Sequence, residues 1–286
     1  MAVTLEQKSH EARPPSGAPA FGERRFGAVN WLGLQTLIAK EIRRFMKVSF
    51  QTIFAPVIST LLFLIVFMQA FGRADTVVHG VPYVEFLAPG LIMMAILSNA
   101  FANSSSSLII GKVQGSIVDV LMPPLSPSEL TVAFVVGAAA RGLLVGFVTA
   151  LTSAGFMALS GASMKLAEPW AIAYFGLAAA LMFGMLGVVG GIWAEKFDQL
   201  AAVTNFVITP LTFLSGTFYA IGSLPEPFLT ASHFNPVFYL IDGLRFGFTG
   251  VYEAAPTVGV GATMSVNAVL AVWCYRLFRV GYKLKS

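Results

Sequence analysis

The chain has 286 residues, of which 56% are hydrophobic and only 11% are charged, whereas soluble domains carry roughly a quarter charged residues. Its apolar residues form blocks of about the twenty residues that a membrane-crossing helix needs, so this composition excludes an ordinary soluble domain. The net charge of +4 is typical of membrane proteins, which collect Lys and Arg on the cytoplasmic side, and indicates topology rather than a nucleic-acid partner.

Cysteine and histidine are too few and too scattered to form a metal centre. Cys274 is the only cysteine, which excludes an intramolecular disulfide and a thiolate cluster within one chain. His10, His79 and His233 have no ligand spacing. We therefore expect neither a metal nor another cofactor in this chain.

The first 50 residues divide into a tail and a helix. Residues 1–27 are rich in Pro, Gly, Ala and charge and are predicted to form a disordered cytoplasmic tail. In residues 28–50, apolar residues recur at three- and four-residue steps, which predicts an amphipathic helix lying at the membrane surface. A soluble surface helix is the alternative. The polar face is predicted to hold Lys40, Glu41, Arg43, Arg44 and Lys47.

Six apolar runs follow, and each is predicted to cross the membrane as a helix. They cover residues 51–71, 86–110, 131–159, 170–193, 200–220 and 258–278. The fifth contains Pro210, where we expect a kink. The predicted fold class is therefore all-α integral membrane, with a transmembrane domain over residues 51–280 and a basic cytoplasmic tail over residues 281–286.

The distribution of basic residues predicts the orientation. With the N-terminus inside, fourteen of the 18 Lys and Arg residues fall in segments on the cytoplasmic side. This asymmetry favours a cytoplasmic location for both termini. It also places residues 111–130, between the second and third spans, in the cytoplasm.

No nucleotide-binding loop is found. Lys112 follows Gly111, but Val113 stands where a phosphate-binding loop has Ser or Thr. Ser, His and carboxylate side chains do not converge in the spans either. We therefore expect no ATPase site and no enzyme activity in this chain alone.

Two predicted spans carry polar side chains. Arg141 lies about eleven residues, or roughly 16 Å, into the third span, where a charge is costly unless it faces water, a carboxylate or a headgroup. It either belongs to a translocation path or a bundle contact, or it snorkels to the interface. Asn99 and Asn103 belong to a polar stripe on the second span, which either holds helices together or follows a substrate path.

The segment between the fifth and sixth spans, residues 221–257, is apolar but broken by prolines. Asn235 and Pro236 fit the start of a helix, in which Asp242 and Arg245 lie three residues apart for an ion pair. Two glycines give this helix a small-residue face. The segment is predicted to form a re-entrant helical hairpin.

Four segments, in this order, resemble the ABC-2 type permeases, the membrane subunits of ATP-binding-cassette exporters. They are KEIRRF at residues 40–45, QGSIVDVL with the following PLS at 114–126, FLSGTFY with the following LP at 213–225, and NPVFYLIDGLR at 235–245. The resemblance covers about residues 29–280.

The resemblance implies a transporter with two permease copies and an ATPase on a separate polypeptide that binds ATP and Mg. It implies export of a drug, lipid-like or glycan substrate across the bacterial inner membrane, in contact with membrane lipids. An ion-gradient-driven secondary transporter or channel is the alternative, although such proteins usually carry carboxylates within their spans. The ATPase-docking residues that it implies are Lys40, Arg43, Arg44, Gln114, Gly115, Ser116, Asp119, Leu121 and Pro124.

Overall fold

The structure is a computed structural model that describes residues 29–71 and 77–284. The predicted disordered tail lies outside this part of the chain, as do the last two residues of the predicted basic tail. The described residues form helices and one antiparallel β-hairpin. In chain order the elements are α1 (Trp31–Met46), α2 (Ser49–Phe71), β1 (Val77–Val78), β2 (Val81–Pro82), α3 (Tyr83–Val113), α4 (Ile117–Leu121), α5 (Pro127–Leu159), α6 (Pro169–Trp193), α7 (Phe197–Val203), the π-helix η1 (Thr204–Ile208), α8 (Thr209–Phe213), the 3-10 helix η2 (Ile221–Ser223), α9 (Glu226–Phe234), α10 (Pro236–Thr249) and α11 (Pro256–Val280).

Five of the described helices, α2, α3, α5, α6 and α11, are long and apolar enough to cross a membrane. Each contains one of the predicted spans and extends it by a few residues at one or both ends. Proline occupies the first position of α5, α6 and α11, where its missing N–H leaves no carbonyl unpaired. The chain is thus a mostly helical protein with five candidate membrane spans.

The predicted fifth span is divided into α7, η1 and α8, so the prediction of six spans is not confirmed. In η1 the hydrogen bonds join residues five apart, as in a π-helix. The backbone N–H of Thr209, for example, donates to the carbonyl of Thr204. Pro210 has no N–H to offer the carbonyl of Phe206, and its ring would collide with that carbonyl in a regular α-helix. The sequence predicts a kink at Pro210, and the structure places the irregular turn just before it.

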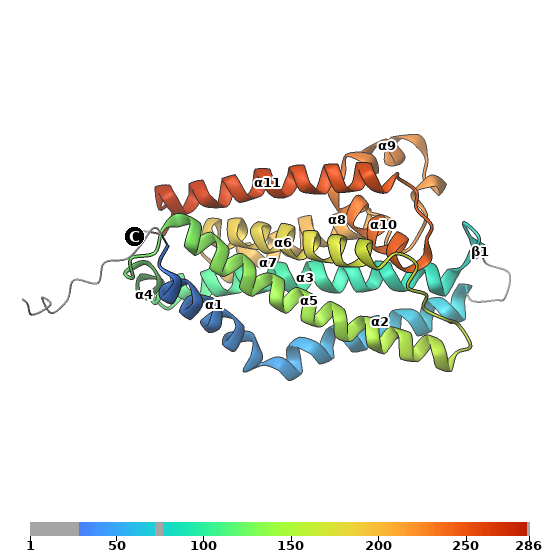
Figure 1. Cartoon of the computed structure of the whole chain (residues 1–286), viewed down its shortest axis with the longest axis horizontal. Helices are drawn as coiled ribbons and strands as arrows, with labels where there is room; N and C mark the ends of the chain where they lie inside the picture. The colour runs from blue at the N-terminus through green and yellow to red at the C-terminus, as the bar shows by residue number, and fades with distance from the viewer. Residues whose placement is uncertain (1–28, 72–76, 285–286) are drawn as a thin grey trace, which may run out of the picture.

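α3 is the central helix and packs along α5 and α6 (Figure 1). Small residues let α3 and α6 approach closely, as is typical of membrane helices. Ser104 Oγ donates to the carbonyl of Gly184 at 2.7 Å. A Cβ atom on Gly187 would lie only 2.2 Å from that same hydroxyl oxygen, so the contact requires glycine.

α10 begins as the sequence predicts. The Asn235 side chain accepts a hydrogen bond from the Val237 N–H at 3.0 Å, and Pro236 takes the first helical position. The predicted glycine face packs on α6, where a Cβ atom on Gly243 would lie 2.4 Å from the Phe175 ring. α9 and α10 thus form two successive short helices, and their re-entrant position in a membrane stays a prediction.

Asp242 and Arg245 do not form the predicted ion pair. Arg245 instead pairs with Glu253 at 3.6 Å and donates to the carbonyls of Phe86 and Gly216 at 3.2 and 2.6 Å. Asp242 accepts backbone N–H bonds from the loop after α10, at 2.9 to 3.2 Å. The spacing of three residues was compatible with a pair, but that loop folds back and supplies other partners. Asp242 therefore holds the following loop against α10, and Arg245 joins α10 to the start of α3 and to the loop after α8.

The predicted cytoplasmic segments that the structure describes gather at one end of the molecule. α1, α4 and the C-terminal end lie there, and the β-hairpin lies at the opposite end (Figure 1). An ion pair of 2.7 Å between Lys283 and Glu195 joins the end of the chain to the turn between α6 and α7. This grouping is what the predicted topology requires.

Candidate functional site

The first candidate site is the surface formed by α1, α4 and the loop from α4 to α5, which we call the α1–α4 surface. Gly115, with a φ of +71°, turns the chain between α3 and α4. Pro123 and Pro124 follow α4. A capping box then begins α5, because Ser126 Oγ accepts from the Glu129 N–H while the Glu129 carboxylate accepts from the Ser126 N–H at 2.6 Å.

Asn30 joins α1 to this loop. Its backbone N–H donates to Glu129 Oε1 at 2.5 Å, and its side-chain amide donates to the Pro124 carbonyl at 3.4 Å. Its Oδ1 accepts from the Gly33 N–H at 3.0 Å and caps α1. Asn30 and Glu129 are not among the predicted site residues, although Ser126 and Glu129 have the capping-box spacing. α1 and the loop form one connected unit.

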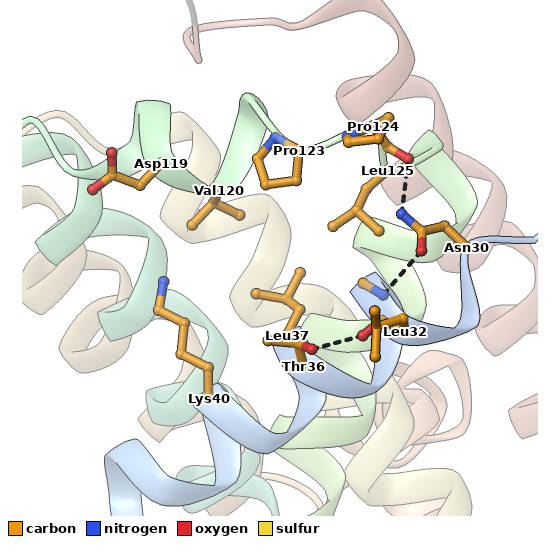
Figure 2. A pocket seen from close by; sticks show the side chains of 11 residues that line it. Asn30, Leu32, Thr36, Leu37, Lys40, Asp119, Val120, Pro123, Pro124 and Leu125 are labelled. Atoms are coloured by element: carbon orange, nitrogen blue, oxygen red, sulfur yellow. Dashed lines mark hydrogen bonds between the residues drawn. The ribbon is translucent and has the colours of Figure 1, made fainter. Parts of the chain in front are cut away.

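A cavity of about 320 Å³ lies between α1 and α4 (Figure 2). Lys40 lines it from α1 and Asp119 lines it from α4, so groups of opposite charge lie on its two sides. The two side chains form no ion pair within 4.0 Å in the described part of the chain. Both are exposed and free to meet a binding partner.

Apolar side chains of the α1–α4 surface are also exposed, and of these Leu32 lines the cavity. The exposed fractions are 53% for Val118, 77% for Met122 and 64% for Leu32. A group of uncovered apolar side chains is typical of a contact surface for another protein or for the membrane. The α1–α4 surface thus combines apolar side chains with charges of both signs.

The predicted docking residues divide by exposure. Leu121 is half-buried and packs against the hydrophobic core, and Ser116 is half-buried as well. Arg44 points inward toward α3. The remaining six are exposed, namely Lys40, Arg43, Gln114, Gly115, Asp119 and Pro124. Their role in docking stays a prediction.

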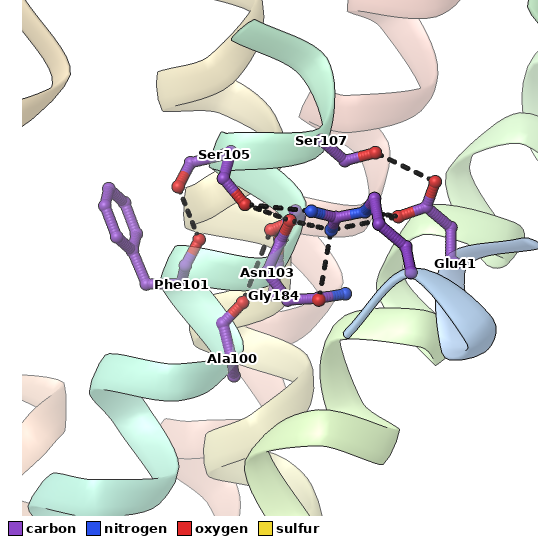
Figure 3. A network of polar contacts seen from close by, with 10 residues as sticks. Glu41, Ala100, Phe101, Asn103, Ser105, Ser107 and Gly184 are labelled. Atoms are coloured by element: carbon purple, nitrogen blue, oxygen red, sulfur yellow. Dashed lines mark hydrogen bonds and ion pairs between the residues drawn. The ribbon is translucent and has the colours of Figure 1, made fainter. Parts of the chain in front are cut away.

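The second candidate site is a polar network that links α1 to α3 (Figure 3). Glu41 is fully buried and accepts hydrogen bonds from Ser107 at 2.8 Å and from Arg44 at 3.2 Å. Arg44 also donates to Oδ1 and to the backbone carbonyl of Asn103, at 3.0 and 2.6 Å. Gly137 of α5 makes room for Glu41, because a Cβ atom there would lie 2.6 Å from Glu41 Cβ.

The prediction that Glu41 belongs to the polar face of α1 is wrong. The buried side chains of α1 are Leu34, Leu37, Glu41 and Phe45, and this spacing of three and four residues puts Glu41 on the apolar stripe. Because Glu41 is charged, the sequence pattern favours the polar face, although its position has the spacing of the apolar stripe. Burial is acceptable because Arg44 and Ser107 satisfy the carboxylate.

Arg141 is half-buried on α5 and points to α3. Its Nε and Nη2 both donate to Asn99 Oδ1, each at 3.3 Å. The structure thus brings Arg141 and Asn99 together, while Asn103, one turn along α3, binds Arg44. The sequence predicts that the polar stripe either holds helices together or follows a substrate path. Asn103 holds helices together, because it binds Arg44 of α1. Asn99 binds Arg141 and also lines a cavity between α2 and α3.

A third polar group lies near the C-terminal end. Lys112 Nζ donates to the carbonyls of Ile192, at 2.7 Å, and Ala194. The Lys283 ammonium donates to Glu195 at 2.7 Å, which lowers the pKa of the Glu195 carboxyl and raises the pKa of Lys283 above their ordinary values. Both groups are largely exposed, so the pair contributes little to stability.

The described residues contain no group of three or more His, Cys, Asp or Glu side chains that could hold a metal ion. Cys274 is buried, and His233 Nδ1 lies 2.9 Å from the carbonyl of Leu229.

Comparison with known proteins gives one matching family model. The model for the ABC-2 type transporter matches residues 33–249, which include most of α1 and all of α4 and α10. The Inner membrane transport permease YadH of Escherichia coli (strain K12) is 35% identical over 257 residues, which cover 90% of this chain and 98% of that protein.

Nodulation proteins are more distant relatives. Nodulation protein J of Sinorhizobium fredii is 28% identical over 202 residues, or 70% of this chain and 72% of that protein. Nodulation protein J of Rhizobium leguminosarum bv. trifolii is 26% identical over 221 residues, or 77% of this chain and 81% of that protein.

Proposed function

Because the chain belongs to the ABC-2 type transporter family, we propose that it is the permease subunit of an ATP-binding-cassette exporter in a bacterial inner membrane. A separate ATPase subunit binds ATP and Mg. Two permease chains together form the path for a drug, a lipid-like molecule or a glycan. The termini, α1 and α4 face the cytoplasm.

The cavity between α1 and α4 is the observation that carries this proposal. It lies at the end of the molecule where the predicted cytoplasmic segments gather. Lys40 and Asp119 line it on opposite sides, and the exposed side chain of Leu32 lines it from α1. A segment of the ATPase that inserts between α1 and α4 would bury Leu32 and pair these charges, and its neighbouring residues would cover Val118 and Met122 on the same surface.

The hydrogen bonds beneath the α1–α4 surface support the transmission of a movement from α1 to the membrane-spanning helices. Asn30 ties α1 to the loop before α5, and Glu41 and Arg44 tie α1 to α3. A displacement of α1 therefore moves the central helix instead of a flexible loop. Coupling of ATP hydrolysis to transport requires that the ATPase contact the permease differently in its two nucleotide states. Because α1 and the loop before α5 form one connected unit, such a change in contact would move the helices that this unit is bonded to.

The exposed face of α2 supports a second permease copy. Phe50, Phe54, Ile58 and Leu62 are exposed along this helix, and the residues of its most apolar window are mostly unburied within one chain. In the assembled transporter, lipid and the second copy cover this face.

The distribution of carboxylates favours this proposal over an ion-gradient-driven transporter. Within the five candidate spans that the structure describes, the only carboxylates are Glu85 and Glu129, each at the third position of its helix. Ion- and proton-coupled transporters usually carry such groups deeper in the membrane. Uptake or efflux that persists without ATP and follows an ion gradient would favour the alternative.

The test is copurification of the ATPase with the tagged permease from native membranes, with ATPase activity measured in the complex. Val118→Glu combined with Met122→Glu replaces two exposed apolar contacts by charges. We expect the amount of bound ATPase to fall by about tenfold or more, which corresponds to about 1.4 kcal/mol.

Leu166→Glu is the matched control, because Leu166 is an exposed apolar residue of the α5–α6 loop. We expect this variant to retain the ATPase. Equal retention by the double variant and the control would contradict docking at the α1–α4 surface, provided that both variants reach the membrane in equal amounts.

A further inference from the structure

Arg141 lies near the middle of α5, fourteen residues or about 21 Å from its first residue. A charge at this depth in a candidate span costs several kcal/mol unless a partner compensates it. The three ion pairs within the described residues are Glu41–Arg44, Arg245–Glu253 and Lys283–Glu195. Arg141 belongs to none of them, so its positive charge is uncompensated within this part of the chain.

The contacts of Arg141 are weaker than those of the other inward-pointing arginines. Arg44 has a carboxylate at 3.2 Å and a carbonyl at 2.6 Å. Arg245 donates at 2.6 and 3.2 Å and stacks 3.7 Å from the Phe86 ring centre. Among the described residues, Arg141 has only one neutral oxygen of Asn99 as acceptor, at 3.3 Å, whereas charge-assisted bonds are usually about 2.7–2.9 Å long. Most of its five N–H donors remain available.

Asn99, the hydrogen-bond partner of Arg141, lines a cavity. It has a volume of about 240 Å³, lies between α2 and α3, and includes Asn99 in its wall. Ser98, Ser59 and Thr60 add hydroxyl groups to that wall. Because Asn99 both lines the cavity and accepts from Arg141, the guanidinium lies one side chain away from the space.

The α3 wall of the cavity is polar at one end and apolar at the other. α2 and α3 run in opposite directions, because the end of α2 meets the start of α3 at the rings of Phe67 and Tyr83 and both helices line this cavity along their length. Ser98 and Asn99 therefore lie at one end of the α3 wall, and Leu91 and Met94 lie toward the other end, where Phe63 faces them from α2. This arrangement fits a molecule with a polar head and an apolar chain.

We propose that Arg141, Asn99 and Ser98 bind the anionic headgroup, a phosphate or carboxylate, of an amphiphilic substrate whose apolar part occupies the cavity between α2 and α3. The anion supplies the charge that Arg141 lacks, and guanidinium with a planar or tetrahedral oxyanion forms paired hydrogen bonds. The inference rests on the proposed export function and narrows its cargo to anionic amphiphiles.

The test is binding of radiolabelled dodecyl phosphate to the purified chain in phosphatidylcholine nanodiscs. We expect saturable binding that weakens at least about tenfold in Arg141→Gln, and less in Arg141→Lys, which keeps the charge but loses the planar fork. Arg276→Gln removes an exposed arginine of α11 and should bind normally. Dodecyl maltoside, with a neutral head, should not compete.

Two further variants separate binding from folding. Asn99→Asp keeps the shape and gives Arg141 a carboxylate partner, so it should preserve the fold and weaken binding by competing with the ligand. Ser59→Phe should fill the cavity and weaken binding while Arg141 stays intact. Unlabelled inorganic phosphate distinguishes a site for the free anion from a site for the whole amphiphile. If phosphate competes at a concentration equal to that of dodecyl phosphate, the affinity comes from the anion alone. If it does not compete, the affinity depends on the whole amphiphile.

Equal binding by wild type and Arg141→Gln, or by wild type and Asn99→Asp, would overturn the proposal and leave Arg141 a bundle contact. The measurement needs no ATPase. Loss of ATPase copurification would therefore refute the proposed function without changing this result, and normal copurification with Arg141-independent binding would refute only the anionic cargo.

Discussion

The burial of Glu41 depends on a single glycine of a neighbouring helix. Glu41 enters the bundle because Gly137 on α5 has no side chain at the point of contact. Once inside, the carboxylate is satisfied by Arg44 and Ser107. The glycine at this position of α5 thus allows α1 to pack closely against the bundle.

Gly137→Ala should therefore detach α1. The added methyl group would lie 2.6 Å from Glu41 Cβ, a distance that forces the helices apart, and overpacking of this kind costs about 1–3 kcal/mol. We expect faster proteolysis of α1 and a lower unfolding temperature of the purified protein in detergent, both measured against wild type.

Gly155→Ala is the matched control on the same helix. A Cβ atom there meets nothing within 4 Å, so the substitution should be neutral or slightly stabilising, because Ala forms helix better than Gly by about 1 kcal/mol. Equal stability of the two variants would show that α1 does not depend on close contact at Gly137.

At the scale of elements, sequence patterns within one segment predicted the features that depend on residues of that same segment. Five long helices, the N-cap at Asn235 and the glycine face of α10 follow from hydropathy, capping and small-residue spacing. The network around Glu41 and the partners of Arg245 depend on residues far apart in the chain. Sequence spacing could not identify those partners.

The interruption between α7 and α8 has a local cause that the sequence showed only in part. Pro210 predicts a disturbance but not its form, because either a kink or a π turn accommodates the missing N–H. The π turn is compatible with two bonds to the Thr204 carbonyl, from the N–H and, at 3.0 Å, the Oγ1 of Thr209.

Pro210→Ala should convert this segment toward a regular helix. The new N–H can donate to the carbonyl of Phe206, and Ala is favoured over Pro in a helix interior by about 3 kcal/mol. We expect amide hydrogen exchange across residues 197–213 to slow by about tenfold or more, measured by mass spectrometry in nanodiscs. Pro56→Ala, in the uninterrupted α2, should leave this segment unchanged. Unaltered exchange in Pro210→Ala would assign the π turn to packing and to Thr209 instead.

At the scale of the whole molecule, the structure and the charge pattern divide the chain in the same way. The end that carries α4 also holds the basic residues of α1, Lys112 at the end of α3, Lys196 before α7, and the basic residues from Arg276 to Lys283. Lys165 lies in the α5–α6 loop. Positive charge collects on the cytoplasmic side of membrane proteins. This distribution predicts which end faces the cytoplasm, and single-cysteine labelling can test it.

Cys274 makes this test simple, because the chain has only this cysteine and it is buried. In a Cys274→Ala background, Gln114→Cys should react with a membrane-impermeant maleimide only in inverted vesicles, and Ser116→Cys should react on the same side more slowly because Ser116 is half-buried. Leu166→Cys should react only in intact spheroplasts. The reverse pattern would invert the topology and remove the α1–α4 surface from the compartment that holds ATP, so ATPase docking there would fail with it.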